Sequence, residues 1–435
     1  MSAENTWGQR LASANEEVRR GALLEIPQEG ITEKLELVVG ALGDASWRVR
    51  KEAVVLLLSA SDPELVARRL VSVLMTDTQV ARRNAAIEAL CRLGAPAVAP
   101  VAAALSLGGE HRKFLIAPLG ASGDARAVTA LSKCLSDGDE NVRAAAAEAL
   151  GTIDCQEARD VLRRHLLDLC GETLSDQDRL LEKLATLEAL ERLRVPVALA
   201  PLIDLGRHAV LRPAVVRLCG SVQDARALSV IAQGLTDPTR AVKRSALLAL
   251  ARWIEQHGAL FADEVERVLS GLTEDVVGGV ASMVGVQELA LRRAAVDVLG
   301  HGTWPNALSP LVDALADEEL RDAALRALAQ RKNGVVEELV ELCKEANDER
   351  RLALLSVFSH LPAAVENPRV VGLLIETLGD GDPALVAAAA TSLAVVAGKT
   401  ALAPLFQALE GHADLWVRKE SARALALLAE RFGED

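Results

Sequence analysis

The stretch Trp47-Arg48-Val49-Arg50-Lys51-Glu52-Ala53 decides the fold, because its pattern of a valine, neighbouring basic residues and an alanine returns along the whole chain. Related phrases occupy residues 17–22, 80–86, 141–146, 241–246, 291–295 and 416–420. The period is about 31 residues, which is typical of stacked helical units rather than of a globule with one core. The repeat therefore predicts a solenoid in which each unit contacts only its neighbours.

The composition favours helices. Of the 435 residues, 50% are hydrophobic, only 2% are aromatic and none is Tyr. Small aliphatic residues let helices pack closely, and no alternating run of β-branched residues indicates a sheet. We therefore predict an all-α fold and one continuous solenoid over residues 1–435. The excess of Arg over Lys and the abundant Ala also favour a bacterial source.

The net charge of −13 disfavours nonspecific binding to nucleic acids or to membrane surfaces. The sequence therefore predicts no nucleic-acid partner and no membrane partner. The first 20 residues are too polar for a signal peptide, and no apolar run is long enough to span a bilayer. The six Cys residues show no C-x-x-C pairing, which is typical of reduced thiols that fill a core. These features together predict a cytoplasmic protein.

The units align on one residue of the phrase, which we call the anchor residue. The anchors are Arg19, Arg50, Arg82, Arg112, Arg143, Glu182, Arg212, Lys243, Arg292, Arg321, Arg350, Val386 and Arg418. Most steps between them are roughly 29 to 32 residues, which gives about 13 units. An alanine usually follows at the third position after the anchor and an aliphatic residue near the seventh, as expected for a helix with one buried stripe.

The second half of each unit predicts another helix. A turn rich in Gly, Pro or Asp leads into an amphipathic segment, for example at residues 94–105 and 304–311. Asp often stands between this helix and the next anchor helix, where a carboxylate can cap free N–H groups. The Asp residues in question are Asp44, Asp77, Asp137, Asp237, Asp317, Asp380 and Asp414.

Two short helices per unit, the D…VR..A..AL phrase and the period together resemble the HEAT-repeat family, over essentially the whole chain. The short, Gly-rich form of the repeat is similar to the HEAT-like repeats of bilin lyases. The resemblance implies a right-handed superhelix of about 13 two-helix repeats. It also implies that the anchor helices line the concave face and that an Asp–Arg ladder joins successive units.

Catalytic motifs are missing from the sequence. No His is followed by Glu, as the ligands of a HEAT-like hydroxylase would require, and aromatic residues are too scarce for a base-stacking glycosylase cleft. The chain also lacks H-E-x-x-H, phosphate-binding and nucleophile-elbow motifs. We therefore predict no enzyme activity, no cofactor and no metal, and a protein-interaction scaffold or regulatory adaptor. The alternative is a bilin-lyase-like enzyme or enzyme-assisting protein.

The residue after the anchor is basic in most units. This basic row comprises Arg20, Lys51, Arg83, Lys113, Lys183, Arg244, Arg293, Arg351 and Lys419. At 100° per residue, this position points away from the buried stripe and should be exposed. The row is therefore our candidate partner-binding site for an acidic segment of another protein. The alternative is an ordinary solvated surface with local ion pairs.

The step from Lys243 to Arg292 is longer than the others, so residues 243–291 form an irregular unit. Its segment 276–286 is apolar, uncharged and Gly-rich. Glycine weakens a helix, and insertions in repeat proteins often form binding loops. The segment is therefore either a mobile docking loop or a buried helix. We favour burial, because Val276, Val280 and Val284 share one helical stripe.

Overall fold

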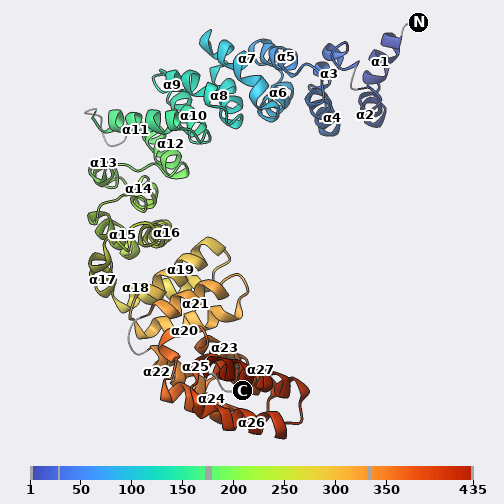
Figure 1. Cartoon of the computed structure of the whole chain (residues 1–435). Helices are drawn as coiled ribbons and strands as arrows, with labels where there is room; N and C mark the ends of the chain where they lie inside the picture. The colour runs from blue at the N-terminus through green and yellow to red at the C-terminus, as the bar shows by residue number, and fades with distance from the viewer. Residues whose placement is uncertain (1–2, 28–29, 172–178, 332–334, 433–435) are drawn as a thin grey trace. The chain divides into compact units, whose positions relative to one another are not determined.

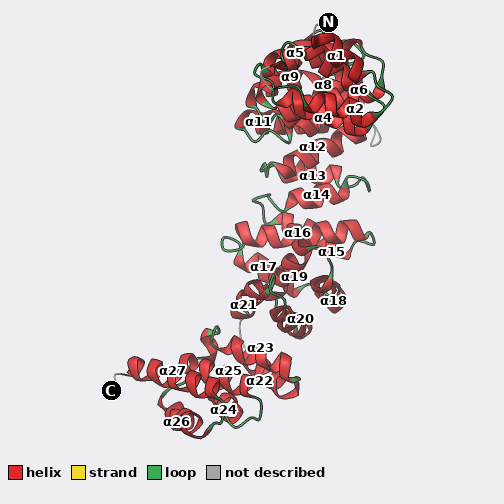
Figure 2. Ribbon diagram, turned by 90° about the vertical axis from the view of Figure 1, so that its right-hand side faces the viewer, coloured by secondary structure: helices red, strands yellow, loops and turns green. Residues whose placement is uncertain are grey.

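The computed structural model describes residues 3–27, 30–171, 179–331 and 335–432. Within these ranges every regular element is an α-helix or a short 3-10 helix, and Figure 2 shows helices joined by loops. The all-α prediction is therefore confirmed. The chain divides into two compact units, Met1–Val222 (unit 1) and Gln223–Asp435 (unit 2). A single continuous solenoid stays a prediction.

Unit 1 is a double row of helices (Figure 1, blue to green). Its anchor helices are α2 (Glu16–Leu24), α4 (Trp47–Leu58), α6 (Val80–Leu93), α8 (Arg112–Ala121), α10 (Glu140–Leu150), α12 (Leu180–Arg192) and α14 (Arg212–Cys219), each packed on the next. The second helices are α3 (Leu35–Ala41), α5 (Pro63–Thr76), α7 (Ala95–Ser106), η2 (Ala125–Ala127) with α9 (Val128–Cys134), α11 (Gln156–Gly171) and α13 (Leu199–Leu205). The helix α1 (Ala3–Leu11) packs on α2.

Unit 2 also alternates anchor helices with other short helices, and its described residues contain more 3-10 turns than those of unit 1. Its anchor helices are α16 (Arg240–His257), α19 (Leu289–His301), α21 (Arg321–Gln330), α23 (Asp348–Phe358), α25 (Pro383–Val396) and α27 (Leu415–Phe432). The intervening elements are α15 (Arg226–Thr236), α17 (Ala262–Ser270), α18 (Glu274–Ser282), η3 (Met283–Gly285), η4 (Pro305–Ala307), α20 (Leu308–Asp313), η5 (Ala314–Ala316), α22 (Val335–Glu345), η6 (Pro362–Ala364), α24 (Pro368–Thr377), η7 (Lys399–Ala401) and α26 (Leu402–Gly411).

The core follows the register of the anchor helices. In α4, the side chains at the third, fourth and seventh positions after Arg50 are buried, namely Ala53, Val54 and Leu57. Helical geometry places these positions on one stripe, and small residues there let neighbouring helices approach closely. The same register holds in α2, α6, α8, α10, α14, α16, α19 and α25.

Two anchor assignments were wrong by one residue. In α23 the stripe Leu354, Leu355 and Phe358 is buried while Ala353 is only half-buried, so the anchor position belongs to Arg351 rather than Arg350. In α12 the anchor position belongs to Lys183 rather than Glu182, because the buried residues are Thr186, Leu187 and Leu190. Both phrases hold two adjacent charged residues, so the sequence pattern fits either register.

The segment 276–286 is helical, which contradicts the loop alternative. It forms most of α18 and all of η3, which pack on α19, and α18 also packs on η4. The buried side chains are Val277 and Val280, whereas Val276 and Val284 are half-buried. The expected burial is therefore confirmed at Val280, and the second buried residue is Val277 rather than Val276 or Val284. The long step between anchors accommodates α18 as an additional helix.

The Asp residues between helices form turns that lead into the anchor helices. Each accepts a hydrogen bond from the backbone N–H two residues later. In α4, for example, Asp44 accepts from Ser46, and Ser46 is itself the N-cap residue. The expected capping role is thus mostly an Asx turn two residues before the N-cap, which sets the entry angle of the helix.

Candidate partner-binding surface on the anchor helices

The anchor arginines hold each repeat to its own turn and to the next repeat. Arg19 Nη1 donates to the carbonyl oxygens of Ser13 and Ala14, and its Nε and Nη2 donate to Asp44 of the following repeat at 2.7 and 2.8 Å. Burial alone would raise the pKa of Asp44, but the Arg19 guanidinium and the Ser46 N–H hold it below its usual value. The anchor is therefore structural.

This contact recurs as a ladder along both units. Arg112 pairs with Asp137 at 2.5 Å, and Arg143 donates to Glu182 at 2.7 Å. The further ladder pairs are Arg292 with Asp317 and, consistent with the corrected register, Arg351 with Asp380. The ladder that the family resemblance implied is present in the described residues, with Glu182 replacing an Asp at one step.

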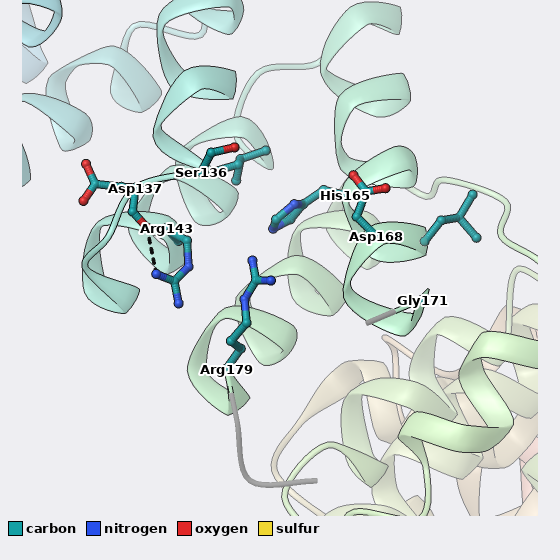
Figure 3. Close-up of a pocket in the computed structure, with 9 residues that line it drawn as sticks. Ser136, Asp137, Arg143, His165, Asp168, Gly171 and Arg179 are labelled. Carbon is teal, nitrogen blue, oxygen red and sulfur yellow. Dashed lines mark hydrogen bonds between the residues drawn. The ribbon is translucent and has the colours of Figure 1, made fainter. Parts of the chain in front are cut away.

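Glu182 is the most enclosed charge of the ladder, because its side chain is fully buried. Arg179 donates to both of its carboxylate oxygens at 2.8 Å, and His165 Nε2 lies 2.9 Å from Oε1. Figure 3 shows Arg143, His165 and Arg179 converging from three segments. Burial would raise the pKa of Glu182, but its contacts with His165, Arg179 and Arg143 lower it to about 2.

The basic row is only partly exposed, contrary to the expectation from helical geometry. Lys51, Lys113, Arg293 and Lys419 are exposed. The half-buried members are Arg20, Arg83, Arg244 and Arg351. Lys183 is buried, with only 6% of its surface accessible, because it occupies the inward anchor position of α12. The row therefore does not run through every repeat.

Several members of the row already have carboxylate partners. Arg20 lies 3.4 Å from Glu52, Arg244 pairs with Glu288, and Arg351 pairs with Asp380 at 2.8 Å. A paired cation has less to offer an acidic ligand, because its charge is already neutralised locally. These residues contribute to the packing of neighbouring repeats rather than to an open surface.

Lys51, Arg83 and Lys113 differ from the other row members of α2, α16 and α23. Among the described residues, no carboxylate lies within ion-pair distance of any of the three. They occupy equivalent positions on α4, α6 and α8, which pack on one another in sequence (Figure 1). We call these three residues the open basic row.

Phe114 of α8 holds two of these cations in place. The guanidinium carbon of Arg83 lies 4.9 Å from the centre of its ring, and Lys113 Nζ lies 5.3 Å from it. Such cation–π contacts contribute about 0.5–1 kcal/mol each at exposed sites and leave the positive charge available. Phe114 was not among the predicted binding residues, although its place directly after Arg112 and Lys113 could have indicated cation–π contacts.

A groove of about 280 Å³ separates α4 from α6 beside the open basic row. Lys51 and Trp47 line one wall, and Ala81, Ala85 and Asn84 line the other. The Trp47 side chain is unusually accessible for its size, with the residue 61% exposed. Exposed aromatic residues with apolar bodies are typical anchors for partner side chains. The surface thus combines charge, an aromatic wall and an amide group.

Other hollows on the anchor helices carry different chemistry. A groove of about 270 Å³ between α10 and α12 is lined by two carboxylates, Glu148 and Glu188, together with Arg192, and has Ala144 at the position of the basic row. The groove beside Lys51 has one carboxylate, Glu88. The larger hollow beside Arg143, His165 and Arg179, of about 700 Å³, surrounds residues that already serve the ladder (Figure 3). The open basic row with its groove is therefore the stronger candidate for binding.

The described residues hold no group of three or more His, Cys, Asp and Glu side chains that could bind a metal ion. The six Cys residues are free thiols, and burial raises the pKa of the Cys219 thiol to about 12. In the part of the chain that is described, no helix is both long and apolar enough to cross a membrane.

The repeat geometry defines a class, the helical solenoids, and a comparison with family models gives the family. A model for HEAT repeats matches residues 4–91, 98–173 and 364–434, which is more than half of the chain. The chain belongs to the HEAT-repeat family. No curated protein matches it.

Solved structures include similar chains, and the first of the three described here supports the solenoid fold. A chain from a structure of Kap95p binding to RanGDP shares 12% identity, with a TM-score of 0.55, and the alignment covers 99% of this chain and 72% of that one. Importin beta, crystallised in an ammonium sulfate condition, shares 15% identity over 99% of this chain and 56% of that chain, with a TM-score of 0.45. An engineered protein shares 19% identity over 98% and 99% of the two chains, with a TM-score of 0.33.

Proposed function

We propose that this protein is a non-catalytic, cytoplasmic interaction scaffold or regulatory adaptor that binds an acidic segment of another protein. HEAT solenoids typically act as interaction scaffolds, and membership of that family supports this class of function. The binding surface in the proposal is the open basic row of Lys51, Arg83 and Lys113 with the adjoining groove. A bacterial source remains a proposal from composition.

One observation carries the proposal. Three cations on consecutive helices lack carboxylate partners, although the protein as a whole has a net charge of −13. Acidic side chains are therefore plentiful in this chain, yet none forms an ion pair with these three residues, and Asp77 and Asp139 act on Arg83 and Lys113 only over longer distances. Complementary charge steers an acidic partner to such a surface and excludes basic ones. The lyase-type alternative stays a prediction of the family resemblance, because no feature of the site favours it.

The test compares two charge-reversal variants with the same change in net charge. The first carries Lys51→Glu, Arg83→Glu and Lys113→Glu. The control carries Arg68→Glu, Lys133→Glu and Arg207→Glu, which are exposed in unit 1 on or beside the second helices. Binding of a fluorescein-labelled oligoglutamate peptide is followed by anisotropy at low and moderate salt.

We expect the wild-type protein to bind the peptide and to lose affinity as salt rises, because exposed charges are screened. The first variant should weaken binding roughly 30-fold or more, and the control should change it by less than about 3-fold. Equal losses in both variants would show a general effect of net charge and contradict the proposal. Absence of binding by the wild-type protein would also contradict it.

A further inference from the structure

The spacing between the cations of the open basic row limits which backbone conformation of a bound peptide can place an acidic side chain at each cation. The helices α4, α6 and α8 pack consecutively, and packed helices lie about 8–10 Å apart. Lys51 faces α6 across the groove, and Arg83 and Lys113 share the ring of Phe114. The three cations hold equivalent positions on successive anchor helices, so we take the helix spacing as the spacing of the row.

An extended peptide matches this spacing. A polyproline II segment advances about 3.1 Å per residue and has three residues per turn, so every third side chain returns to the same face after about 9 Å. A β-strand advances about 3.3 Å per residue but alternates its faces, so its third residue points the other way. An α-helix advances about 5.4 Å per turn, so it would need two turns, about seven residues, for each cation. The polyproline II conformation is the one that meets the row with one acidic residue in every three.

The groove also restricts which side chain a bound peptide can have between the acidic residues that would face Lys51 and Arg83. Trp47, Ala81 and Ala85 offer apolar surface there, and Asn84 offers both a donor and an acceptor to a peptide backbone. Glu88 lines the same groove and lies 3.6 Å from Arg92, so its own charge discourages an acidic side chain inside. A bulky apolar side chain suits this position better than a charged one.

We propose that the partner is an extended segment in which acidic residues recur at every third position to meet Lys51, Arg83 and Lys113. One of the two residues between the first and second acidic positions is bulky and apolar, and it enters the groove against Trp47. This inference rests on the proposed function, because it uses the same surface, and it specifies the partner's conformation and sequence register.

The experiment uses labelled peptides of identical charge on the full-length protein, and the first three also have identical composition. In one peptide the three acidic residues are three positions apart, in the second they are four apart, and in the third they are adjacent. A fourth peptide keeps the three-residue spacing but has Ser in place of the apolar residue. We expect the first peptide to bind at least about 10-fold more tightly than the second and third.

Trp47→Ala is the second arm of the test. It should weaken the apolar peptide about 10-fold and leave the Ser peptide within about 2-fold, because only the former uses the groove. The Lys51→Glu, Arg83→Glu, Lys113→Glu variant, checked for an unchanged circular dichroism spectrum, should lose all four peptides.

The outcomes separate the two proposals. Equal affinity for all spacings, together with loss in the charge-reversal variant, would overturn the register and leave the proposed function standing. Failure of every peptide to bind the wild-type protein would overturn both. A single-stranded oligonucleotide that binds more tightly than any peptide would show that the row recognises phosphates, and would also overturn both.

Discussion

The residue after the anchor has different surroundings in different repeats, as α16 of unit 2 and α4 and α6 of unit 1 show. In unit 2, Arg244 of α16 pairs with Glu288, which is the N-cap residue of the next anchor helix. In unit 1, the N-cap residue of the helix after Lys51 is Gln79, and the one after Arg83 is His111. Neither is a carboxylate, so Lys51 and Arg83 have no ion-pair partner at these positions.

The neighbouring repeat thus determines whether the basic residue after the anchor is paired or available for binding. Lys113 faces Asp139 at the next N-cap, but Asp139 accepts hydrogen bonds from both the N–H and the amide of Asn141. Where a carboxylate of the next repeat forms an ion pair with the cation, the cation supports packing, and where none does, the charge is available to a partner. Each of the following changes tests this division.

The largest effect is expected from Glu182→Ala. The change leaves the surrounding arginines without their buried carboxylate and should destabilise unit 1 by about 3–5 kcal/mol. Lys51→Ala, by contrast, should change stability by less than about 0.5 kcal/mol, because the side chain has no carboxylate partner to lose. Urea unfolding followed by circular dichroism measures both, with the exposed Glu88→Ala as a control. Similar losses in the free energy of unfolding for all three variants would contradict the distinction between paired and open charges.

Acid should reveal the same buried charge. Glu182 has a folded-state pKa of about 2 against an ordinary value of 4.5. Its stabilisation is therefore complete above pH 4.5 and is lost as the pH falls from there towards 2, by about 3 kcal/mol in all. Unfolding free energies across this range should fall less steeply in Glu182→Gln than in the wild-type protein. Parallel pH profiles would show that Glu182 is not the group responsible.

A smaller difference in the loss of stability is expected between the Arg351→Ala and Lys51→Ala variants. Arg351→Ala removes the half-buried pair with Asp380 and should cost about 1–2 kcal/mol, whereas Lys51→Ala should be nearly neutral. Thermal unfolding compares the two. Lys51→Ala should instead weaken the acidic peptide, and Arg351→Ala should leave peptide binding unchanged. An exchange of these two results would place the binding surface in unit 2.

The smallest effect is expected from Phe114→Leu. The substitution keeps an apolar side chain but removes the ring that holds Arg83 and Lys113. Loss of this orientation should weaken acidic-peptide binding about 3-fold, which corresponds to roughly 0.6 kcal/mol. Anisotropy titration measures the change, and Phe114→Trp should retain binding. A tighter complex after Phe114→Leu would mean that the ring competes with the partner.

The sequence by itself determined the helical repeat, because the periodicity records which side chains are buried within each repeat. Ala53, Val54 and Leu57 could be placed in the core from their spacing alone. The sequence also predicted that arginine anchors and acidic residues join neighbouring repeats, through the family resemblance. Register was less certain where charged residues stand side by side, as the shifts at Lys183 and Arg351 show.

Only the tertiary structure decided which cations are open. Helical geometry treats Lys51, Lys183 and Arg244 alike, but they end as exposed, buried and paired side chains. The difference arises because a surface charge responds to residues from the next repeat, such as Gln79 or Glu288, which lie far away in sequence. Burial of an apolar stripe is a local property of one helix, whereas the pairing of a charge is a property of two repeats packed together.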